Sequence, residues 1–410
     1  MKDLCHSDAL ISLDQALANI SSAISPLRGD EMTKLPIALG RVLSTRCIAP
    51  VDLPAFPNSS MDGYAFNSAD IQQAGFSLTL AGISWAGRPY EAKLERGQCV
   101  RIFTGAVVPS GADSVMMQEL VEAHDSTIHF PADTKGLQNV RAIAEDVKQG
   151  ECLLSAPKQL TAIDLGLLAA AGIYEVQVKR KIRIAFFSTG DELRPVGSKL
   201  SAGQIYDSNR YSLAALLNNP CHEVNDLGVI ADDKTAIRQS LLQASQSHDV
   251  IITSGGASVG DADYIKEILD EIGQVDFWKL AIKPGKPLAF GRIQDCYFFG
   301  LPGNPISVIA TYQQIVTPAL RHLTALSSQA IRFKAVCKSA LYKTPGRQEF
   351  QRGILHQTDS GEYQVISAGK QGSNILSASS RANCYIILAR EQANVDSGEQ
   401  VLVEPFNLFL

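Results

Sequence analysis

Between residues 181 and 323, short apolar runs alternate with patterns typical of helices, and this alternation constrains the fold more than any other feature of the chain. We expect strands over 182–188, 223–230 and 250–254, and helices over 208–217, 234–245, 264–272 and 305–323. Strands that are separated by helices pair in the same direction, with the helices packed on the sheet. The sequence therefore predicts a parallel-sheet α/β domain in this part of the chain.

The segments on either side of this range predict a different kind of structure. Ser12 and Gln15 mark the start of a first helix, and Thr161 and Asp164 carry a similar signature before a second one. Between these helices, residues 57–142 consist of short alternating runs broken by glycine and proline, which indicates a β-rich lobe. The same pattern returns after residue 329, so we expect a small antiparallel β domain there.

The composition fits a globular protein of several domains and excludes some classes of partner. The chain has 410 residues, 45% of them hydrophobic and 19% charged, with a net charge of −5. Such a charge gives no general attraction to nucleic acid or to an anionic membrane, so any anion must be bound by a local cluster of groups. The longest uncharged stretch, 297–320, contains three prolines, which argues against a membrane span.

Cysteine usage and the first residues lead us to expect a cytoplasmic protein. The eight cysteines are scattered without a Cys-x-x-Cys pair, so we expect reduced thiols and neither zinc knuckles nor disulfides. Lys2, Asp3 and Asp8 precede any apolar run, which is unlike a signal peptide.

Polar residues and glycines follow the predicted strands, at the point where each strand ends. Ligands bind outside the carboxyl ends of the strands in an open parallel sheet, so these segments are candidates for a site. The strand over 250–254 leads into Gly-Gly-Ala-Ser-Val-Gly at 255–260, where backbone N–H groups could approach a phosphate closely. The loop matches neither a Walker A motif nor Gly-x-Gly-x-x-Gly, so a tight structural turn remains the alternative.

Three lysines, Lys279, Lys283 and Lys286, lie in one short segment that we expect at the same sheet edge. This local density of positive charge suits a multiply charged anion, and the prolines at 284 and 287 restrict the backbone between the lysines. A solvated basic turn is the alternative.

Carboxylates are concentrated at the same strand ends, where they would repel a phosphate unless a hard cation lay between them. They are Asp191, Glu192, Asp207, Asp232, Asp233, Asp261 and Asp263. Oxygen ligands without histidine or cysteine fit Mg²⁺ and not zinc. For each carboxylate alone, a helix cap or a surface position is the alternative.

Two segments of the N-terminal half place polar residues in turn-rich sequence. Asp62 lies in Asn-Ser-Ser-Met-Asp-Gly-Tyr-Ala at 58–65, and Thr104 ends a strand pattern at 101–106. Spacing alone defines no chemistry for either, and a structural turn remains the alternative. The histidines show no order that supports a nucleophilic hydrolase.

Taken together, these segments resemble the molybdopterin molybdenumtransferase family, which inserts molybdate into adenylated molybdopterin and includes the C-terminal domain of gephyrin. The matching runs lie in family order along almost the whole chain. They are 58–65, 101–106, 145–146, 187–193, 205–209, 254–264, 279–287, 301–305 and 344–347.

The resemblance implies a multidomain α/β plus β fold. It implies an N-terminal helical region in two pieces, 1–56 and 143–181, with the β-rich lobe at 57–142 inserted between them. A central parallel-sheet, molybdenum-cofactor-binding α/β domain follows at 182–328, and a small β-barrel-like domain at 329–410. It also implies a homodimer whose clefts lie between the α/β domain of one subunit and the β-rich lobe of the other.

The resemblance also implies a set of site residues. The catalytic positions are Asp62, Thr104, Glu192, Asp232 and Asp263, of which the last three would place Mg²⁺. The substrate-binding positions include residues of the glycine loop and of the lysine segment. They are Arg141, Asp146, Gly255, Gly256, Ser258, Lys279, Lys283, Lys286, Pro302, Pro305 and Ser373. Arg141 lacks the neighbouring arginines common in the family, and Ala257 and Ala262 replace its usual Val and Tyr, which we expect to affect affinity and not reaction type.

The expected reaction converts adenylated molybdopterin and molybdate to molybdenum cofactor, with Mg²⁺ as cofactor and release of AMP. Molybdopterin adenylyltransferase and a non-catalytic, gephyrin-like scaffold are the alternatives. Besides its two substrates and a second copy of the chain, we expect a transient contact with the adenylyltransferase, and no nucleic acid or membrane partner. The sequence leaves molybdate and tungstate undistinguished.

Overall fold

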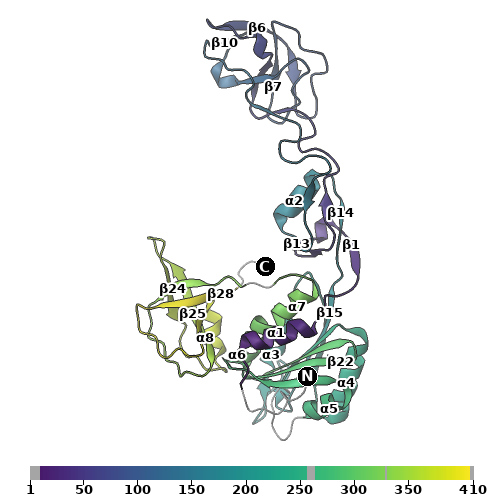
Figure 1. Cartoon of the computed structure of the whole chain (residues 1–410), viewed down its shortest axis with the longest axis vertical. Helices are drawn as coiled ribbons and strands as arrows, with labels where there is room; N and C mark the ends of the chain where they lie inside the picture. The colour runs from purple at the N-terminus through teal and green to yellow at the C-terminus, as the bar shows by residue number, and fades with distance from the viewer. Residues whose placement is uncertain (1–9, 256–263, 328–329, 407–410) are drawn as a thin grey trace. The chain divides into compact units, whose positions relative to one another are not determined.

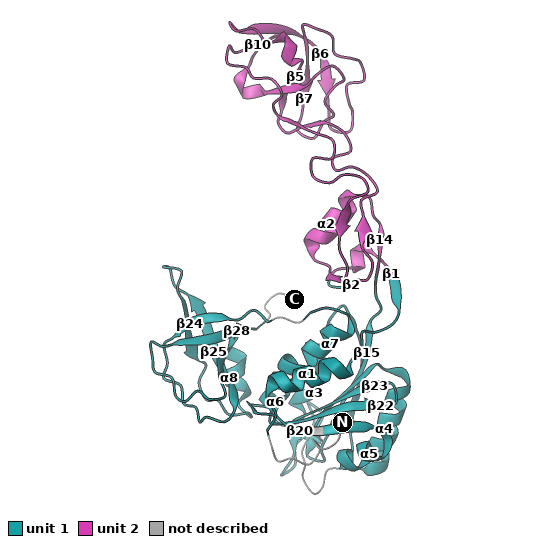
Figure 2. Cartoon of the chain, viewed as in Figure 1, with its two compact units in different colours: residues 1–31, 40–42, 178–410 teal, residues 32–39, 43–177 magenta. Residues whose placement is uncertain are grey.

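The computed structural model describes residues 10–255, 264–327 and 330–406. The described residues form two compact units, one drawn from the ranges 1–31, 40–42 and 178–410 and the other from 32–39 and 43–177 (Figure 2). We call them unit 1 and unit 2 and describe each by itself.

Unit 1 contains a six-stranded sheet that holds the expected strands and helices. The strand order is β18 (His222–Ile230), β15 (Ile182–Thr189), β19 (Val250–Ser254), β23 (Cys296–Leu301), β22 (Pro287–Ile293) and β20 (Gln274–Lys279). The helices α3 (Ser208–Leu217), α4 (Lys234–Ser247) and α5 (Tyr264–Ile272) lie where the sequence predicts them (Figure 1).

The strands expected over 182–188, 223–230 and 250–254 pair in parallel, but the sheet as a whole is mixed. Strands β18, β15, β19 and β23 are parallel, whereas β22 runs antiparallel to both of its neighbours, β23 and β20. Only Gln294 and Asp295 separate β22 from β23. Two residues suffice for a hairpin but not for the crossover that a parallel pair requires.

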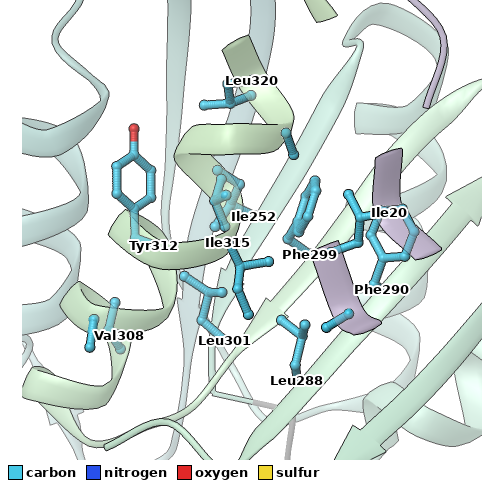
Figure 3. Packing of buried hydrophobic residues seen from close by; sticks show 14 of the residues in the cluster. Ile20, Ile252, Leu288, Phe290, Phe299, Leu301, Val308, Tyr312, Ile315 and Leu320 are labelled. Atoms are coloured by element: carbon cyan, nitrogen blue, oxygen red, sulfur yellow. The ribbon is translucent and has the colours of Figure 1, made fainter. Parts of the chain in front are cut away.

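The sheet is buried on both faces, since side chains of one strand point alternately into two hydrophobic clusters. In β15, Ile184 and Phe186 pack into one cluster, while Ala185 and Phe187 pack into the other. The first cluster includes residues of α1, α3 and the helical run 305–323, and the second includes residues of α4 and α5 (Figure 1). Figure 3 shows Ile252 and Phe299 of the sheet beside Tyr312 and Ile315 of that helical run.

Helix α1 (Leu13–Ala23) forms where the cap signature predicts it, and it packs on the α/β core. The Ser12 hydroxyl accepts a hydrogen bond from the Gln15 N–H at 3.1 Å. Leu13, Ala16 and Ile20 are buried in the first cluster, and Figure 3 shows Ile20 among its residues. The N-terminal helix therefore belongs to the same compact unit as the sheet.

The helix expected over 305–323 is continuous but not uniform. It consists of α6 (Pro305–Thr311), a π-helical segment (Tyr312–Val316) and α7 (Thr317–Leu323). Pro318 cannot donate a backbone hydrogen bond, and a wider turn before it is one way in which a helix accommodates a proline. Pro305 occupies the first turn of α6, where the missing N–H costs nothing.

The C-terminal region forms a closed five-stranded barrel. Its strands pair in the order β25 (Gln348–Gln357), β26 (Tyr363–Ser367), β24 (Phe333–Cys337), β28 (Gln400–Pro405) and β27 (Cys384–Leu388), and β27 pairs back to β25. The barrel differs from the expected antiparallel domain in one pair, since β24 and β26 are parallel. The short strand β21 (Ile282–Lys283) also pairs with β25.

Unit 2 contains a six-stranded sheet that corresponds to the predicted β-rich lobe. Its order is β8 (Ser114–Met117), β5 (Gly63–Phe66), β7 (Gln98–Ile102), β6 (Phe76–Ser84), β10 (Thr127–Phe130) and β9 (Glu122–His124). The ranges 30–56 and 143–177 were expected to be helical. They contain several short strands and one α-helix, α2 (Ala162–Ala170). Its capping box, Thr161 with Asp164, is present. The domain boundaries stated above remain predictions.

The structure also gives the state of the cysteines and the character of the helices. Each cysteine within the described ranges is a free thiol. In the same ranges, no helix combines the length and the apolar character needed to cross a membrane.

Candidate functional site

A cavity of about 740 Å³ opens at the carboxyl ends of the parallel strands in unit 1. Thr189 and Gly190 at the end of β15, Asp232 after β18, and Ser254 and Gly255 at the end of β19 contribute to its wall. The location agrees with the expectation for an open α/β sheet. The barrel supplies further lining residues, Arg347 and the segment 371–373, which strand periodicity does not predict.

The structure brings together about half of the predicted site residues. Those lining the cavity are Glu192, Asp232, Gly255, Lys283, Lys286, Pro302, Pro305 and Ser373. Gly256, Ser258 and Asp263 lie outside the described residues. Lys279 ends β20 and is not among the lining residues. Asp62, Thr104, Arg141 and Asp146 belong to unit 2.

The carboxylates at the strand ends affect one another. The Asp232 N–H donates to Asp191 Oδ1 at 3.4 Å. Partial desolvation and the negative charges of Asp191 and Glu192 raise the pKa of Asp232 above its ordinary value. A raised carboxyl pKa means that negative charge accumulates here without enough compensation from the protein.

Glycine at position 190 leaves room for Glu192. A Cβ atom at Gly190 would lie 2.6 Å from Glu192 Oε2, and the backbone there has a φ of +148°. Gly255 has a φ of +92°, and a Cβ there would lie 3.0 Å from the Thr189 carbonyl oxygen. Both positions therefore favour glycine for steric and conformational reasons. The Gly255 N–H already donates to the Leu301 carbonyl at 3.2 Å, so this residue contributes space and not a phosphate donor.

Lys283 is held at the cavity by the barrel. Its Nζ lies 3.1 Å from Glu349 Oε1, and the register pairs Lys283 of β21 with Glu349 of β25. The Glu349 side chain is only 5% exposed, whereas that of Lys283 is 45% exposed. Gln351 Nε2 donates to the other Glu349 oxygen at 3.0 Å. The ammonium group has three donors, so it can bind an anion in the cavity while it is paired with Glu349.

The start of α3 joins the ends of β19 and β23 through Asn209, which was not among the predicted residues, and it carries Asp207, one of the carboxylates expected at the strand ends. Asp207 caps α3, and its Oδ1 accepts from the Arg210 N–H at 3.1 Å. Asn209 Nδ2 donates to Ser254 Oγ at 2.8 Å and to the Gly303 carbonyl at 2.7 Å. Asp207 Oδ2 and Asn209 Oδ1 are buried and accept no hydrogen bond from the described residues. Asp207 was expected from the concentration of carboxylates at the strand ends, whereas the signal for Asn209 was its place in the run 205–209 that matches the family.

Hydrogen bonds from Arg352 hold the segment that carries Ser373 in place. The Arg352 guanidinium is buried, and Nη2 donates to the Gly372 carbonyl at 3.1 Å. The Arg352 N–H donates to Gln371 Oε1 at 2.8 Å, and the Ser373 carbonyl accepts from the Ile306 N–H at 3.0 Å. These contacts place Gln371 and Ser373 at the cavity wall.

In unit 2, the structure pairs Asp62 with Thr104. Asp62 Oδ1 accepts from the Thr104 N–H at 2.7 Å and from its hydroxyl at 2.8 Å. These bonds, with a smaller contribution from Arg101, lower the pKa of Asp62 below its ordinary value. Asp62 is therefore an ionised acceptor at neutral pH. Arg141 lies in β11 (Val140–Arg141), which pairs with β4 (Asn58–Ser59), and the Asp146 N–H donates to the Leu53 carbonyl.

Residues 11–172 match the MoeA N-terminal region (domains I and II), residues 185–322 a probable molybdopterin binding domain, and residues 334–406 the MoeA C-terminal region (domain IV). A curated relative from Haemophilus influenzae named molybdopterin molybdenumtransferase is 42% identical over 98% of this chain and 100% of its own length. A relative of that name from Nostoc is 35% identical over 94% of this chain and 91% of its own.

The fold is similar to that of solved structures with related names. A crystal structure of the molybdopterin biosynthesis protein MoeA from Pyrococcus horikoshii has a TM-score of 0.84 and 27% identity, covering 97% of this chain and 100% of that one. Gephyrin from Dictyostelium discoideum is 30% identical over 96% of this chain and 62% of its own length. These similarities extend over nearly the whole chain, which therefore belongs to the molybdopterin molybdenumtransferase family.

Proposed function

We propose that the protein inserts molybdenum from molybdate into adenylated molybdopterin and releases AMP in a reaction that requires Mg²⁺. The proposal rests on one cavity at the carboxyl ends of the parallel strands. The acidic residues Asp232 and Glu192 and the basic residues Lys283 and Lys286 all line it. Opposite charges in one cavity suit an anionic substrate that arrives with a divalent cation.

The two lysines would bind the phosphate and oxyanion groups of the substrates. Each ammonium group attracts anions as a compact charge with three donors. Glu349 holds Lys283 from the barrel side, and Pro284 and Pro287 restrict the backbone between Lys283 and Lys286. The Lys283 side chain and the backbone of the segment are thus restrained before substrate binds, so less conformational freedom is lost on binding.

Asp232 and Glu192 would hold Mg²⁺, with Asp263 as the third predicted ligand. The donor set fits, since it consists of carboxylate oxygens, and the raised pKa of Asp232 indicates negative charge that a cation would offset. Among the described residues no group of three or more potential ligands is positioned around one point. When bound, the ion supplies positive charge that polarises a phosphate oxygen and neutralises the leaving phosphate.

The test is AMP release by purified protein given adenylated molybdopterin, with and without molybdate and Mg²⁺. We expect release that depends on both additions and that yields active cofactor. Asp232→Asn should reduce the rate by about 100-fold or more, as expected for loss of electrostatic stabilisation in a catalytic site. Asp295→Asn, at an exposed turn between β22 and β23, is the matched control and should leave the rate unchanged.

Two outcomes would contradict this function. Formation of adenylated molybdopterin from ATP and molybdopterin would favour the adenylyltransferase. Wild-type AMP release by Asp232→Asn and Lys283→Ala proteins would remove the catalytic role from this cavity and favour a scaffold, which is consistent with the similarity to gephyrin.

The proposal extends to assembly and to the second set of predicted residues. We propose a cytoplasmic homodimer in which Asp62 and Thr104 of one subunit complete the site of the other, while Arg141 and Asp146 contribute to substrate binding. A transient contact with the adenylyltransferase would transfer the adenylated substrate. Sedimentation velocity of the purified chain checks the dimer, and a monomer at all concentrations would contradict it.

A further inference from the structure

Unit 1 contains a second cavity, of about 440 Å³, between the barrel and the helices. Its lining comes from α6, the π-helical segment, α8 (Leu376–Arg381), the strands β25 and β27, and the residue after β28. Figure 1 shows α8 beside β25 and α6. Among the described residues, none lines both cavities: in α6, Pro305 and Ser307 line the first, and Ile306 and Ile309 line the second. A ligand here would therefore be additional to the substrates.

The walls of the second cavity are mainly apolar. Its hydrophobic lining residues are Ile306, Ile309, Leu376, Tyr385 and Phe406. The rings of Tyr385 and Phe406 meet edge to face, with their centroids 4.8 Å apart. The Tyr385 hydroxyl donates to Gln313 Oε1 at 2.6 Å, which joins the barrel to the π-helical segment. A largely apolar cavity of this size with a few polar groups is typical of a site for a small organic ligand.

Among the described residues that line this cavity, Arg352 is the one that carries a charge. It lies opposite Tyr385 in the register of β25 and β27, so the two side chains leave the same face of the barrel. Arg352 is only 1% exposed. Nη2 donates to the carbonyls of Lys370 and Gly372. Nε is buried without a partner, and Nη1 donates to no described residue.

The charge of Arg352 is not compensated by a carboxylate of its own. Burial lowers the pKa of Arg352 below its ordinary value, and the interactions with Tyr385 and Glu349 oppose this shift only in part. The oxygens of Glu349 bond Lys283 and Gln351. Buried charges are normally paired, because it is costly to remove an isolated ion from water. An arginine without a carboxylate partner beside a cavity therefore indicates an anionic ligand.

We propose that the second cavity binds a monocarboxylic acid with an apolar body, whose carboxylate accepts hydrogen bonds from Arg352 Nη1 and whose body lies against the apolar walls. One cation matches one negative charge, whereas the second charge of a phosphate would be buried without a partner. Ser379 Oγ, which is also buried without a partner, can donate a further hydrogen bond. This inference does not rest on the function proposed above.

The cavity is accessible from solvent. Ser377 and Ser380 of α8 contribute to its lining and are exposed, whereas the neighbouring Ala378 is buried. A ligand can therefore enter past α8 while the barrel and α6 stay packed together.

Isothermal titration calorimetry with octanoate tests the proposal on the full chain at neutral pH. Octanamide has the same apolar body without the charge, and acetate has the charge without the body. We expect octanoate to bind saturably and both other compounds to bind about 10-fold more weakly or worse, because each lacks either the charge-assisted bond or the buried apolar surface. Equal affinity for octanoate and octanamide, or no binding of octanoate, would overturn the proposal.

Variants locate the binding site. Ser380→Phe places a ring at the exposed edge of the cavity and should abolish octanoate binding. Ser360→Phe, at an exposed turn of the same barrel outside the cavity lining, is the matched control and should bind octanoate as the wild type does. Unchanged binding by Ser380→Phe protein would place the ligand elsewhere and overturn the proposal.

Arg352→Met tests the charge separately and should lower the affinity for octanoate to that for octanamide. Circular dichroism checks the fold of this variant, because Arg352 also bonds the carbonyls of Lys370 and Gly372. If Arg352→Met protein fails to fold, the comparison of octanoate with octanamide on the wild type decides the role of the charge. A folded variant with unchanged octanoate affinity would contradict the proposal.

The chain itself is the alternative occupant. Phe406 lines the cavity, and residues 407–410 lie outside the described ranges. A chain shortened to end at Phe406 should bind octanoate as the full chain does. Binding by the shortened chain but not by the full chain would show that residues 407–410 exclude the ligand, and the proposal would fail for the intact protein.

Discussion

At the scale of single residues, the cavity is defined by charges that the fold places close together. Asp232 lies beside Asp191 and Glu192 because β18 and β15 are parallel neighbours and end at the same edge. Lys283 faces Glu349, which is far away in sequence and belongs to the barrel. Each pair makes a prediction about the protein without substrate.

Asp232→Asn should stabilise the free protein slightly at neutral pH. The pKa of Asp232 is raised, so the folded state binds this proton more tightly than the unfolded state, and stability falls as the pH rises from about 3.8 through the folded pKa. The variant lacks this loss, so we expect a melting temperature higher by on the order of 1 °C at pH 7 and no difference below pH 3.8. Thermal melts across pH check it; a lower melting temperature at pH 7 would contradict it, and Mg²⁺ should narrow the difference.

Lys283→Ala should lower both anion affinity and stability, and Glu349 separates the two effects. The variant leaves the buried Glu349 carboxylate without its cation, which we expect to cost about 1–2 kcal/mol. In the double variant Lys283→Ala with Glu349→Gln, stability should return while AMP release stays low. Urea unfolding and the AMP assay measure the two properties. Recovery of activity in the double variant would show that Lys283 acts only through the ion pair.

At the scale of elements, an ionic cluster at the amino ends of the central strands stabilises the sheet, at the end opposite to the cavity. Asp249 precedes β19, and its carboxylate accepts from Arg180 Nη1 at 2.7 Å, from Arg180 Nη2 at 2.8 Å and from the Arg183 N–H at 2.8 Å. Arg183 lies in β15, so these bonds join the starts of two central strands. Burial alone would raise the pKa of Asp249, but the bonds from the arginines lower it to about 2.

Asp249→Asn should destabilise the fold without affecting substrate binding. The pKa falls from 3.8 to about 2 on folding, which corresponds to about 2 kcal/mol of stability that is present above pH 3.8 and lost as the pH falls toward 2. We expect urea unfolding at pH 7 to show this loss and the KM for adenylated molybdopterin to stay unchanged, since Asp249 lies at the other end of the strands. Near pH 2 the wild-type and Asp249→Asn proteins should have the same free energy of unfolding. Equal stability of the two proteins at pH 7 would contradict a stabilising role for Asp249.

At the scale of the whole molecule, the predicted site residues fall on two compact units. The cavity and its charged groups belong to unit 1, and the pair Asp62 with Thr104 belongs to unit 2. The proposed dimer would bring the two sets together from different subunits, and this arrangement can be tested without a structure of the dimer.

Two inactive variants should complement each other when mixed. Subunits of Asp62→Asn and Asp232→Asn protein that exchange into heterodimers would form one intact site and one doubly altered site. Random exchange then restores up to about a quarter of wild-type AMP release, because half of the dimers are mixed and each has one working site. Mixing Asp232→Asn with Lys283→Ala protein is the control and should restore no activity, because both substitutions lie on unit 1 and every site of a mixed dimer then carries one of them. Absence of recovery in the Asp62→Asn and Asp232→Asn mixture despite verified exchange would contradict a site shared between subunits.

Some of this architecture follows from local sequence pattern. The caps at Ser12 and Thr161, the strands of 182–254 and the helices between them depend on residues a few positions apart, so their types and approximate bounds are readable in the chain. The placement of a site at the carboxyl ends of the strands follows from the same alternation. It predicted Glu192, Asp232 and Gly255 as neighbours, and these three line the cavity.

Other features required the tertiary structure, because they join segments that are far apart in the chain. The reversal of β22, the closure of the barrel, and the contribution of Arg347 and Gln371 to the cavity depend on strand register and packing. So do the bonds between Lys283 and Glu349 and between Asp62 and Thr104. Periodicity specifies which side of an element is buried but not which distant segment packs against it. The charges in this cavity come from segments that only the packing brings together, so only the tertiary structure determines them.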